Sequence, residues 1–230
     1  MSAPLLSFTR SAANSRAVNP ALRLKNPQDA ASVAGLDRLK QSFIPVITAP
    51  GKPLPCARLL FGWHGTSSAT VAAVCRDGPR ALRTLDSGYF GAWSYFALEA
   101  EYALRYSTPE PATGERAMIL FAISVSQVKV ITLEEDYRLV EGQDPRALTL
   151  QGFSKYYGGA DTAIALARGY DAHFIPVKDY GCTHPRAGYC TPCTIGYQAV
   201  DESSGAAEAH EIVIQSHHQC IPIAIVYFKA

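Results

Sequence analysis

Four potential metal ligands lie close together in the last third of the chain. They form the series Cys182-x-His184-x5-Cys190-x2-Cys193. Three thiolates and one imidazole make up the closed tetrahedral ligand set of a structural zinc ion, which leaves no open position for catalysis. The Cys190 to Cys193 spacing is a usual zinc half-site, whereas the Cys182 to His184 spacing is tighter than usual. The pattern predicts a structural zinc site. The alternative is a set of reduced cysteines and a surface histidine without metal.

Three further segments carry side chains that could bind a ligand. They are LLFGWHGT, GYFGAWSYFALEAEYALRYS and HEIVIQSHHQCIPIAIVYF. Their polar, aromatic and glycine residues of interest are His64, Gly65, Thr66, Tyr95, Tyr106 and Glu211. Taken singly, such residues are more typical of strand ends, half-buried packing and solvated carboxylates than of a site.

Taken together and in this order, the three segments resemble the catalytic domain of poly(ADP-ribose) polymerases (PARPs). These are diphtheria-toxin-like ADP-ribosyltransferases with a His–Tyr–Glu triad. The resemblance covers about residues 56–230. It implies an α+β ADP-ribosyltransferase (PARP-like) fold, with two packed, mostly antiparallel sheets and short helices. It also implies that NAD is the substrate and that ADP-ribose is transferred, as one unit or as a polymer, to a protein acceptor.

The resemblance implies an NAD-binding role for five residues. His64 and Thr66 are expected to contact the adenine-side ribose, and Gly65 the carboxamide of nicotinamide. Tyr106, on the helix after the Tyr-Phe-Ala segment, is expected to stack on the nicotinamide ring. Tyr95 is expected to pack against this ring from the other side.

The resemblance also implies a catalytic set of His64, Tyr95 and Glu211. Cleavage of the nicotinamide–ribose bond passes through an oxocarbenium-like sugar, which a nearby carboxylate stabilises. Glu211 is expected to supply this carboxylate at the start of the penultimate strand. Two positions depart from the family pattern: Trp93 replaces a frequent glycine, and Ala103 replaces a serine that bonds the carboxamide. Loss of one hydrogen bond of about 1 kcal/mol weakens NAD binding several-fold.

Other readings of the same residues remain open. The chain could be an NAD glycohydrolase of the same fold, with water as the acceptor. It could also be an inactive module that binds ADP-ribose or a partner. The acceptor could be the chain itself or a nucleic acid. Tankyrases, within the same family, also carry a short zinc-binding segment, but at an earlier place, so the cysteines do not indicate a tankyrase.

Composition places the chain among globular proteins. It has 230 residues, 48% of them hydrophobic and 18% charged, with a net charge of +1. These values exclude a disordered chain or a fibre. A net charge near zero argues against broad electrostatic binding to nucleic acid or to anionic membranes, and no membrane partner is expected.

The six cysteines and the absence of a signal peptide favour a reducing compartment. We expect an intracellular protein of the cytoplasm or nucleus. Disulfides, mitochondrial targeting and secretion as an effector are alternatives. The first 28 residues are rich in alanine and serine and contain arginine but no acid, as in a transit peptide or a disordered leader.

The elements that must position these residues divide the chain in two. Residues 1–55 are expected to form an N-terminal extension with a disordered leader, a short helix capped by Asp29 and a Pro-rich linker. Residues 56–230 are expected to form the catalytic domain, with a zinc-binding insertion at about 179–209. Strands outnumber helices and do not alternate regularly with them, which indicates an α+β domain with mostly antiparallel strands.

Overall fold

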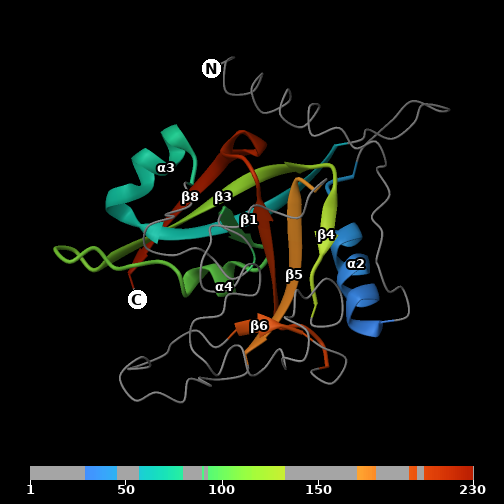
Figure 1. Cartoon of the computed structure of the whole chain (residues 1–230). Helices are drawn as coiled ribbons and strands as arrows, with labels where there is room; N and C mark the ends of the chain where they lie inside the picture. The colour runs from blue at the N-terminus through green and yellow to red at the C-terminus, as the bar shows by residue number, and fades with distance from the viewer. Residues whose placement is uncertain are drawn as a thin grey trace, which may run out of the picture.

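The computed structural model describes residues 29–45, 57–79, 90, 93–132, 170–179, 197–200 and 205–229 (Figure 1). Its helices are α2 (Ala30–Ser42), α3 (Val71–Asp77) and α4 (Ala100–Leu104), with 3-10 turns η1 (Ser68–Thr70) and η3 (His217–Gln219). Its strands are β1 (Arg58–Ser67), β2 (Ser94–Ala97), β3 (Glu115–Val125), β4 (Val128–Val130), β5 (Ala172–Asp179), β6 (Tyr197–Ala199), β7 (Ala209–Ile214) and β8 (Cys220–Lys229). Within the described part of the chain, no helix is long and apolar enough to span a membrane.

The strands form one eight-stranded sheet in the order β4-β5-β7-β2-β1-β3-β8, with β6 paired to β5. Only the pair of β4 and β5 is parallel among the described strands. The α+β class and the mostly antiparallel pairing are therefore confirmed. Two packed sheets were expected, but hydrogen bonds join the described strands into one continuous sheet.

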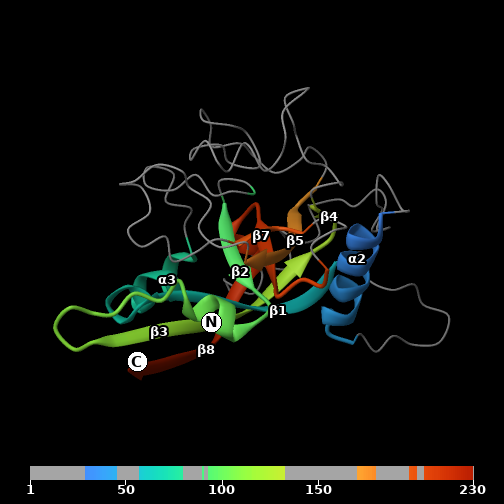
Figure 2. The same ribbon diagram turned by 90° about the horizontal axis from the view of Figure 1, so that it is seen from below.

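The sheet has two halves that meet at a narrow joint. Strands β8, β3 and β1 form one half, and β2, β7, β5 and β4 form the other. The register between β1 and β2 consists of one pair, Trp63 with Ala97. Figure 2 shows β2 running across the direction of β3 and β8. The joint between the two halves therefore rests on little strand pairing.

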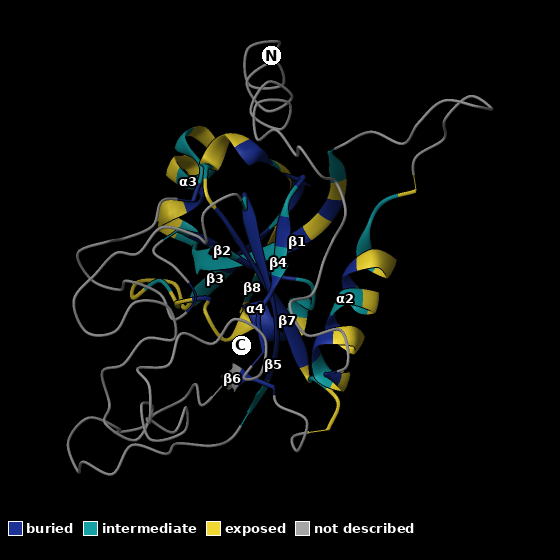
Figure 3. Ribbon diagram, turned by 45° about the vertical axis from the view of Figure 1, so that its right-hand side comes forward, coloured by how far each residue is buried: buried dark blue, intermediate teal, exposed yellow. Residues whose placement is uncertain are grey.

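Two clusters of buried side chains fill the interior. Figure 3 shows that the buried residues lie mainly along the strands. The larger one contains Phe96, Phe121 and Phe174, and the smaller one contains Tyr102, Ile175 and Val213. Most of these residues come from strands rich in β-branched and aromatic residues, which pack well on a pleated surface, whereas Tyr102 comes from α4. The smaller cluster borders part of the candidate site described below, since Tyr95 packs against it.

Helix α2 packs against the sheet although its sequence was assigned to the N-terminal extension. Asp29 caps it as predicted, since its Oδ1 accepts a hydrogen bond from the Ala31 N–H at 3.0 Å. Leu39 is fully buried, and Gly35 lies so close to β5 that a Cβ there would be 2.7 Å from Pro176 Cγ. The isolated bridge of Phe43 to β1 continues this attachment beyond the end of the helix.

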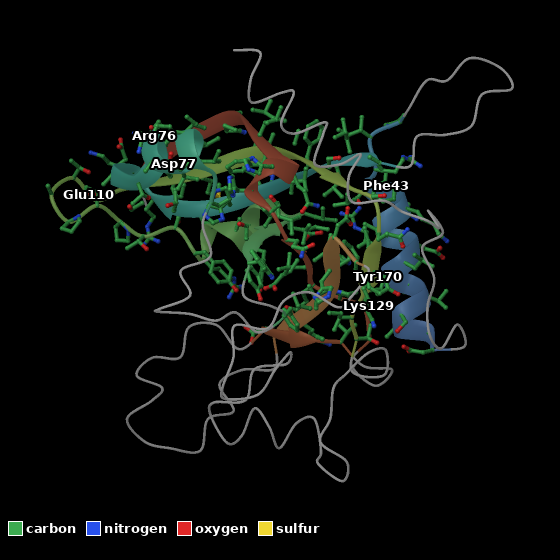
Figure 4. All side chains as sticks on the ribbon, turned by 45° about the horizontal axis from the view of Figure 1, so that its top comes forward. Phe43, Arg76, Asp77, Glu110, Lys129 and Tyr170 are labelled. Atoms are coloured by element: carbon green, nitrogen blue, oxygen red, sulfur yellow. The ribbon has the colours of Figure 1, made fainter. Side chains whose placement is uncertain are left out.

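Surface contacts join neighbouring residues and strands (Figure 4). Arg76 and Asp77 on α3 form an ion pair with an Nη2 to Oδ2 distance of 3.1 Å. The Lys129 Nζ on β4 lies 5.2 Å from the centroid of the Tyr170 ring, which precedes β5. Exposed contacts of this kind contribute little to stability. The fold therefore depends mainly on the two buried clusters.

Candidate active site

The candidate site lies where the two halves of the sheet meet. Trp63 on β1 pairs with Ala97 on β2, and Ala97 pairs with Glu211 on β7. Tyr95 lies two residues before Ala97 and pairs with Val213. Paired residues of neighbouring strands face the same side of a sheet, so Glu211 and Tyr95 lie on one face. The structure thus brings His64, Tyr95 and Glu211 onto three neighbouring strands.

His64 is held by the backbone of β2. Its Nδ1 lies 2.9 Å from the carbonyl oxygen of Tyr95. Because a carbonyl oxygen only accepts hydrogen bonds, Nδ1 carries the proton and Nε2 is free to accept one. Burial lowers the pKa of His64, and the hydrogen bond to Tyr95 only partly offsets this effect. The imidazole is therefore neutral at pH 7, and its Nε2 can accept a hydrogen bond.

Glycine is required at position 65 because the backbone there lies very close to the segment around α4. A Cβ at this position would lie 2.2 Å from the carbonyl oxygen of Ala103 and 2.9 Å from the nitrogen of Ser107. Both of these atoms belong to the backbone and cannot rotate away. The next residue, Thr66, has its hydroxyl 2.6 Å from that of Thr70. The predicted glycine thus has a packing reason that is independent of any ligand.

Tyr95 is fixed at both ends. Its carbonyl holds His64, and its hydroxyl accepts a hydrogen bond from the Phe90 N–H at 2.8 Å. The carbonyl of Phe90 in turn accepts from Nδ1 of the buried His173 at 2.9 Å. His173 carries no signal in the sequence as a site residue, because nothing there links it to Phe90, 83 positions away.

Tyr106 and Glu211 are connected through a third side chain, Tyr102. The hydroxyl of Tyr102 donates a hydrogen bond to Oε1 of Glu211. Its single proton is then committed, so the Tyr106 hydroxyl, 2.9 Å away, must be the donor of the other bond. Burial and the negative charge of Glu211, together with Tyr106, raise the pKa of Tyr102 far above its usual value. Tyr102 therefore stays protonated and remains a donor to the carboxylate.

Helix α4 is shorter than the sequence indicated. It ends at Leu104, so Tyr106 lies in the turn after the helix rather than on it. Tyr106 is 43% exposed and its ring is available to a ligand, whereas Tyr102 is buried. The spacing of Tyr102 and Tyr106 is the signal that could have revealed the pair, because residues four apart lie on one side of a helical turn.

The predicted metal ligands lie outside the described residues. These are Cys182, His184, Cys190 and Cys193. Among the residues that the structure describes, no group of three or more histidine, cysteine, aspartate or glutamate side chains could hold a metal ion. The described cysteines, Cys75 and Cys220, are free.

A scan against protein-family models matches residues 37–162 to the poly(ADP-ribose) polymerase catalytic domain. The match spans more than half of the chain, and the chain therefore belongs to this family. Membership implies NAD as substrate and ADP-ribosyltransferase activity in general. The matched range includes His64, Tyr95 and Tyr106 but ends before Glu211. No curated protein matches the chain.

Proposed function

We propose that the chain transfers ADP-ribose from NAD to a protein acceptor, with Glu211 as the catalytic carboxylate. The observation that supports this assignment is the pairing of Glu211 with Ala97, which places the carboxylate beside the strand that carries Tyr95. The same carboxylate accepts the hydrogen bond of Tyr102, which is linked to the exposed Tyr106. A negative charge is thus held next to a ring that is suited to stack on nicotinamide.

The reaction breaks the bond between the ribose C1′ and the nicotinamide nitrogen. The electron pair of this bond leaves with nicotinamide, which becomes neutral, and positive charge develops on the ribose. The Glu211 carboxylate stabilises this charge and accepts a hydrogen bond from a ribose hydroxyl. A nucleophile of the acceptor then forms a bond to C1′ and loses its proton to solvent or to a carboxylate.

The other family residues bind NAD in this proposal. His64 accepts a hydrogen bond from a ribose hydroxyl at its neutral Nε2, and Thr66 lies two residues further along the same strand. The backbone of Gly65 contacts the carboxamide, while Tyr106 and Tyr95 enclose the nicotinamide ring. The hydrogen bonds that fix His64 and Tyr95 support this proposal, because a preorganised site loses less free energy on binding.

The test is to incubate the full chain with labelled NAD and compare it with Glu211→Gln. This substitution keeps the shape of the side chain and an oxygen that accepts from Tyr102, but removes the charge. We expect nicotinamide release to fall by about 100-fold or more, the usual cost of losing a residue that stabilises transition-state charge. Label should remain on protein in the wild type only.

Glu208→Gln is the matched control, because Glu208 is an exposed glutamate just before β7. It should leave the rate unchanged. Nicotinamide release without labelled protein indicates hydrolysis, and a ladder of labelled species indicates polymer. An unchanged rate in Glu211→Gln contradicts the role of this carboxylate. No release by the folded wild-type chain contradicts the proposed function as a whole.

We also propose a structural zinc ion bound by Cys182, His184, Cys190 and Cys193, on the basis of their types and spacing. The full chain, purified without chelator, should contain about one zinc per molecule by elemental analysis. Cys190→Ser and Cys193→Ser should each lose this zinc, whereas Cys75→Ser should keep it. A zinc content that is negligible, or that neither substitution changes, contradicts the site.

A further inference from the structure

Glu99 and His210 form a clamp directly beside the Ala97 to Glu211 pair. Oε2 of Glu99 accepts the backbone N–H of His210 at 2.8 Å, and Oε1 lies 2.9 Å from Nδ1 of the same residue. The N–H of Leu98 donates to the carbonyl oxygen of His210 at 3.0 Å. Residues 98 and 99 are thus joined to residue 210 by three hydrogen bonds. The carboxylate of Glu99 takes the place of the backbone partner that β2 no longer supplies, since β2 ends at Ala97.

The clamp lies on the face of β7 opposite to Glu211, because successive side chains of a strand point to opposite sides. His210 is buried, and its ring stacks on Phe174 with 5.4 Å between ring centroids and 22° between ring planes. Arg38 of α2 adds an outer contact, with its Nη2 3.3 Å from Oε1 of Glu99. These contacts restrict the clamp from two further elements, α2 and β5.

The Glu99 carboxyl group of the clamp is ionised. Burial opposes ionisation of Glu99, but the hydrogen bonds and charge of His210, with the contact to Arg38, hold the pKa of Glu99 below its usual value. A carboxylate can only accept hydrogen bonds, so Nδ1 of His210 carries a proton. Hydrogen bonds to a charged group are stronger than neutral ones, so both bonds from His210 are of the strong kind.

Glu99 also begins the short helix that carries Tyr102. It is the N-cap residue of α4, and Tyr102 is the third residue of this five-residue helix. A helix this short is not stable by itself, so its neighbours determine its position. The clamp joins the start of α4 to the residue directly before Glu211. It therefore restrains the position of the Tyr102 hydroxyl relative to the Glu211 carboxylate.

We propose that Glu99 and His210 are positioning residues for Glu211 in the ADP-ribosyl transfer proposed above, on which this inference rests. They touch neither NAD nor the reacting atoms. They hold α4 and β7 together so that the Tyr102 hydroxyl and the Glu211 carboxylate keep their hydrogen bond. Small displacements of such groups cost rate steeply, about 100-fold for 1 Å in some enzymes.

The test compares Glu99→Ala, His210→Ala and His210→Asn in the full chain, with nicotinamide release measured against NAD concentration. We expect both alanine variants to lower kcat by about 10-fold or more, the cost of losing a charge-assisted hydrogen bond, while the KM for NAD changes less than about twofold. His210→Asn should restore most of kcat, because the asparagine amide nitrogen can stand where Nδ1 stands.

Asp37→Ala is the matched control. It removes an acidic partner from a 2.9 Å ion pair, but this pair, with Lys40, is exposed on α2. It should leave kcat and KM unchanged.

If Glu99→Ala fails to fold, Glu99→Gln replaces it. The glutamine keeps one oxygen that can accept a hydrogen bond from His210. Its amide N–H faces the other N–H of His210, and two donors cannot bond to each other, so an intermediate loss of kcat is expected.

A double variant separates positioning from general destabilisation. In a Glu211→Gln background, Glu99→Ala should cause no further loss of the residual release, because the clamp acts through Glu211. An equal loss in both backgrounds overturns the inference, as does a wild-type kcat in folded Glu99→Ala. A folded wild-type chain that releases no nicotinamide refutes the proposed function, and this inference with it. An active wild type with an unaffected clamp variant refutes the inference alone.

Discussion

Tyr102 shows how the site depends on a side chain outside the His–Tyr–Glu pattern. It is buried, stays protonated and donates its hydrogen bond to Glu211. The carboxylate is thereby kept in one orientation before NAD arrives. The same hydroxyl accepts from Tyr106, so the residue expected to stack on nicotinamide is coupled to the carboxylate. The site therefore depends on a series of hydrogen bonds as well as on the three residues of the His–Tyr–Glu pattern.

Tyr102→Phe should slow catalysis without weakening NAD binding. The substitution keeps the buried ring but removes the hydrogen bond to a charged group, which is worth about 1.5–3 kcal/mol. We expect kcat for nicotinamide release to fall by about 10- to 100-fold and the KM for NAD to change less than about twofold. Tyr227→Phe, at an exposed tyrosine of β8, is the control. Equal kinetics for the two variants would show that Tyr102 does not orient Glu211.

His64 makes stability depend on pH. The unfolded chain binds a proton at this residue with a pKa of about 6.5, whereas the folded chain resists it because burial lowers the pKa. Below this pH the unfolded state binds more protons, so the free energy of unfolding decreases as the pH falls from 7 to 5. In urea titrations, His64→Asn should show a smaller decrease than the wild type. An equal decrease contradicts a neutral His64 with a lowered pKa.

Helix α4 is an element whose position is determined by its neighbours. Strand β1 packs closely against it at Gly65, and β7 is joined to it by the hydrogen bonds between Glu99 and His210. Arg116 of β3 adds a hydrogen bond from its Nη1 to the Ser107 carbonyl at 2.6 Å, just after the helix. Three strands therefore restrain a segment that is too short to be stable alone.

Gly65→Ala should displace this segment. Its Cβ would lie 2.2 Å from the Ala103 carbonyl, and the conflict can be relieved only by a backbone shift. We expect a loss of stability of about 1–3 kcal/mol and a rise in the KM for NAD. Gly62→Ala, in the same strand, would meet Ile123 and Phe96 instead. It should destabilise the protein while leaving the KM nearer to the wild-type value. Matching KM values for both variants contradict the role of Gly65 in placing α4.

At the scale of the whole molecule, the sheet has a buried end and an exposed end. The edge strand β8 is ten residues long and pairs with β3 on one side. Large apolar side chains are exposed on it and on β1 in the same half of the sheet: Leu59, Phe61, Ile223, Ile225, Val226 and Tyr227. A long apolar edge of this kind favours association between chains.

Ile225→Lys should reduce this association. The side chain is 43% exposed, so a lysine can extend into solvent, and the stability should change by less than about 0.5 kcal/mol. Light scattering of concentrated protein should decrease, because a charge on an edge strand discourages further strand pairing. Melting temperature serves as the control for folding. Unchanged scattering contradicts the view that this edge limits solubility.

The α+β class, the helix cap at Asp29 and the family could be read from the sequence because they depend on local patterns: alternation, capping and short motifs in order. Tertiary structure decided what those patterns leave open. It joined the strands in one sheet, ended α4 before Tyr106, and placed Tyr102 against Glu211. It also joined Glu99 to His210, which lie 111 positions apart. Such contacts depend on which strands pair and in which register, and pairing is a property of the folded chain that no single segment carries.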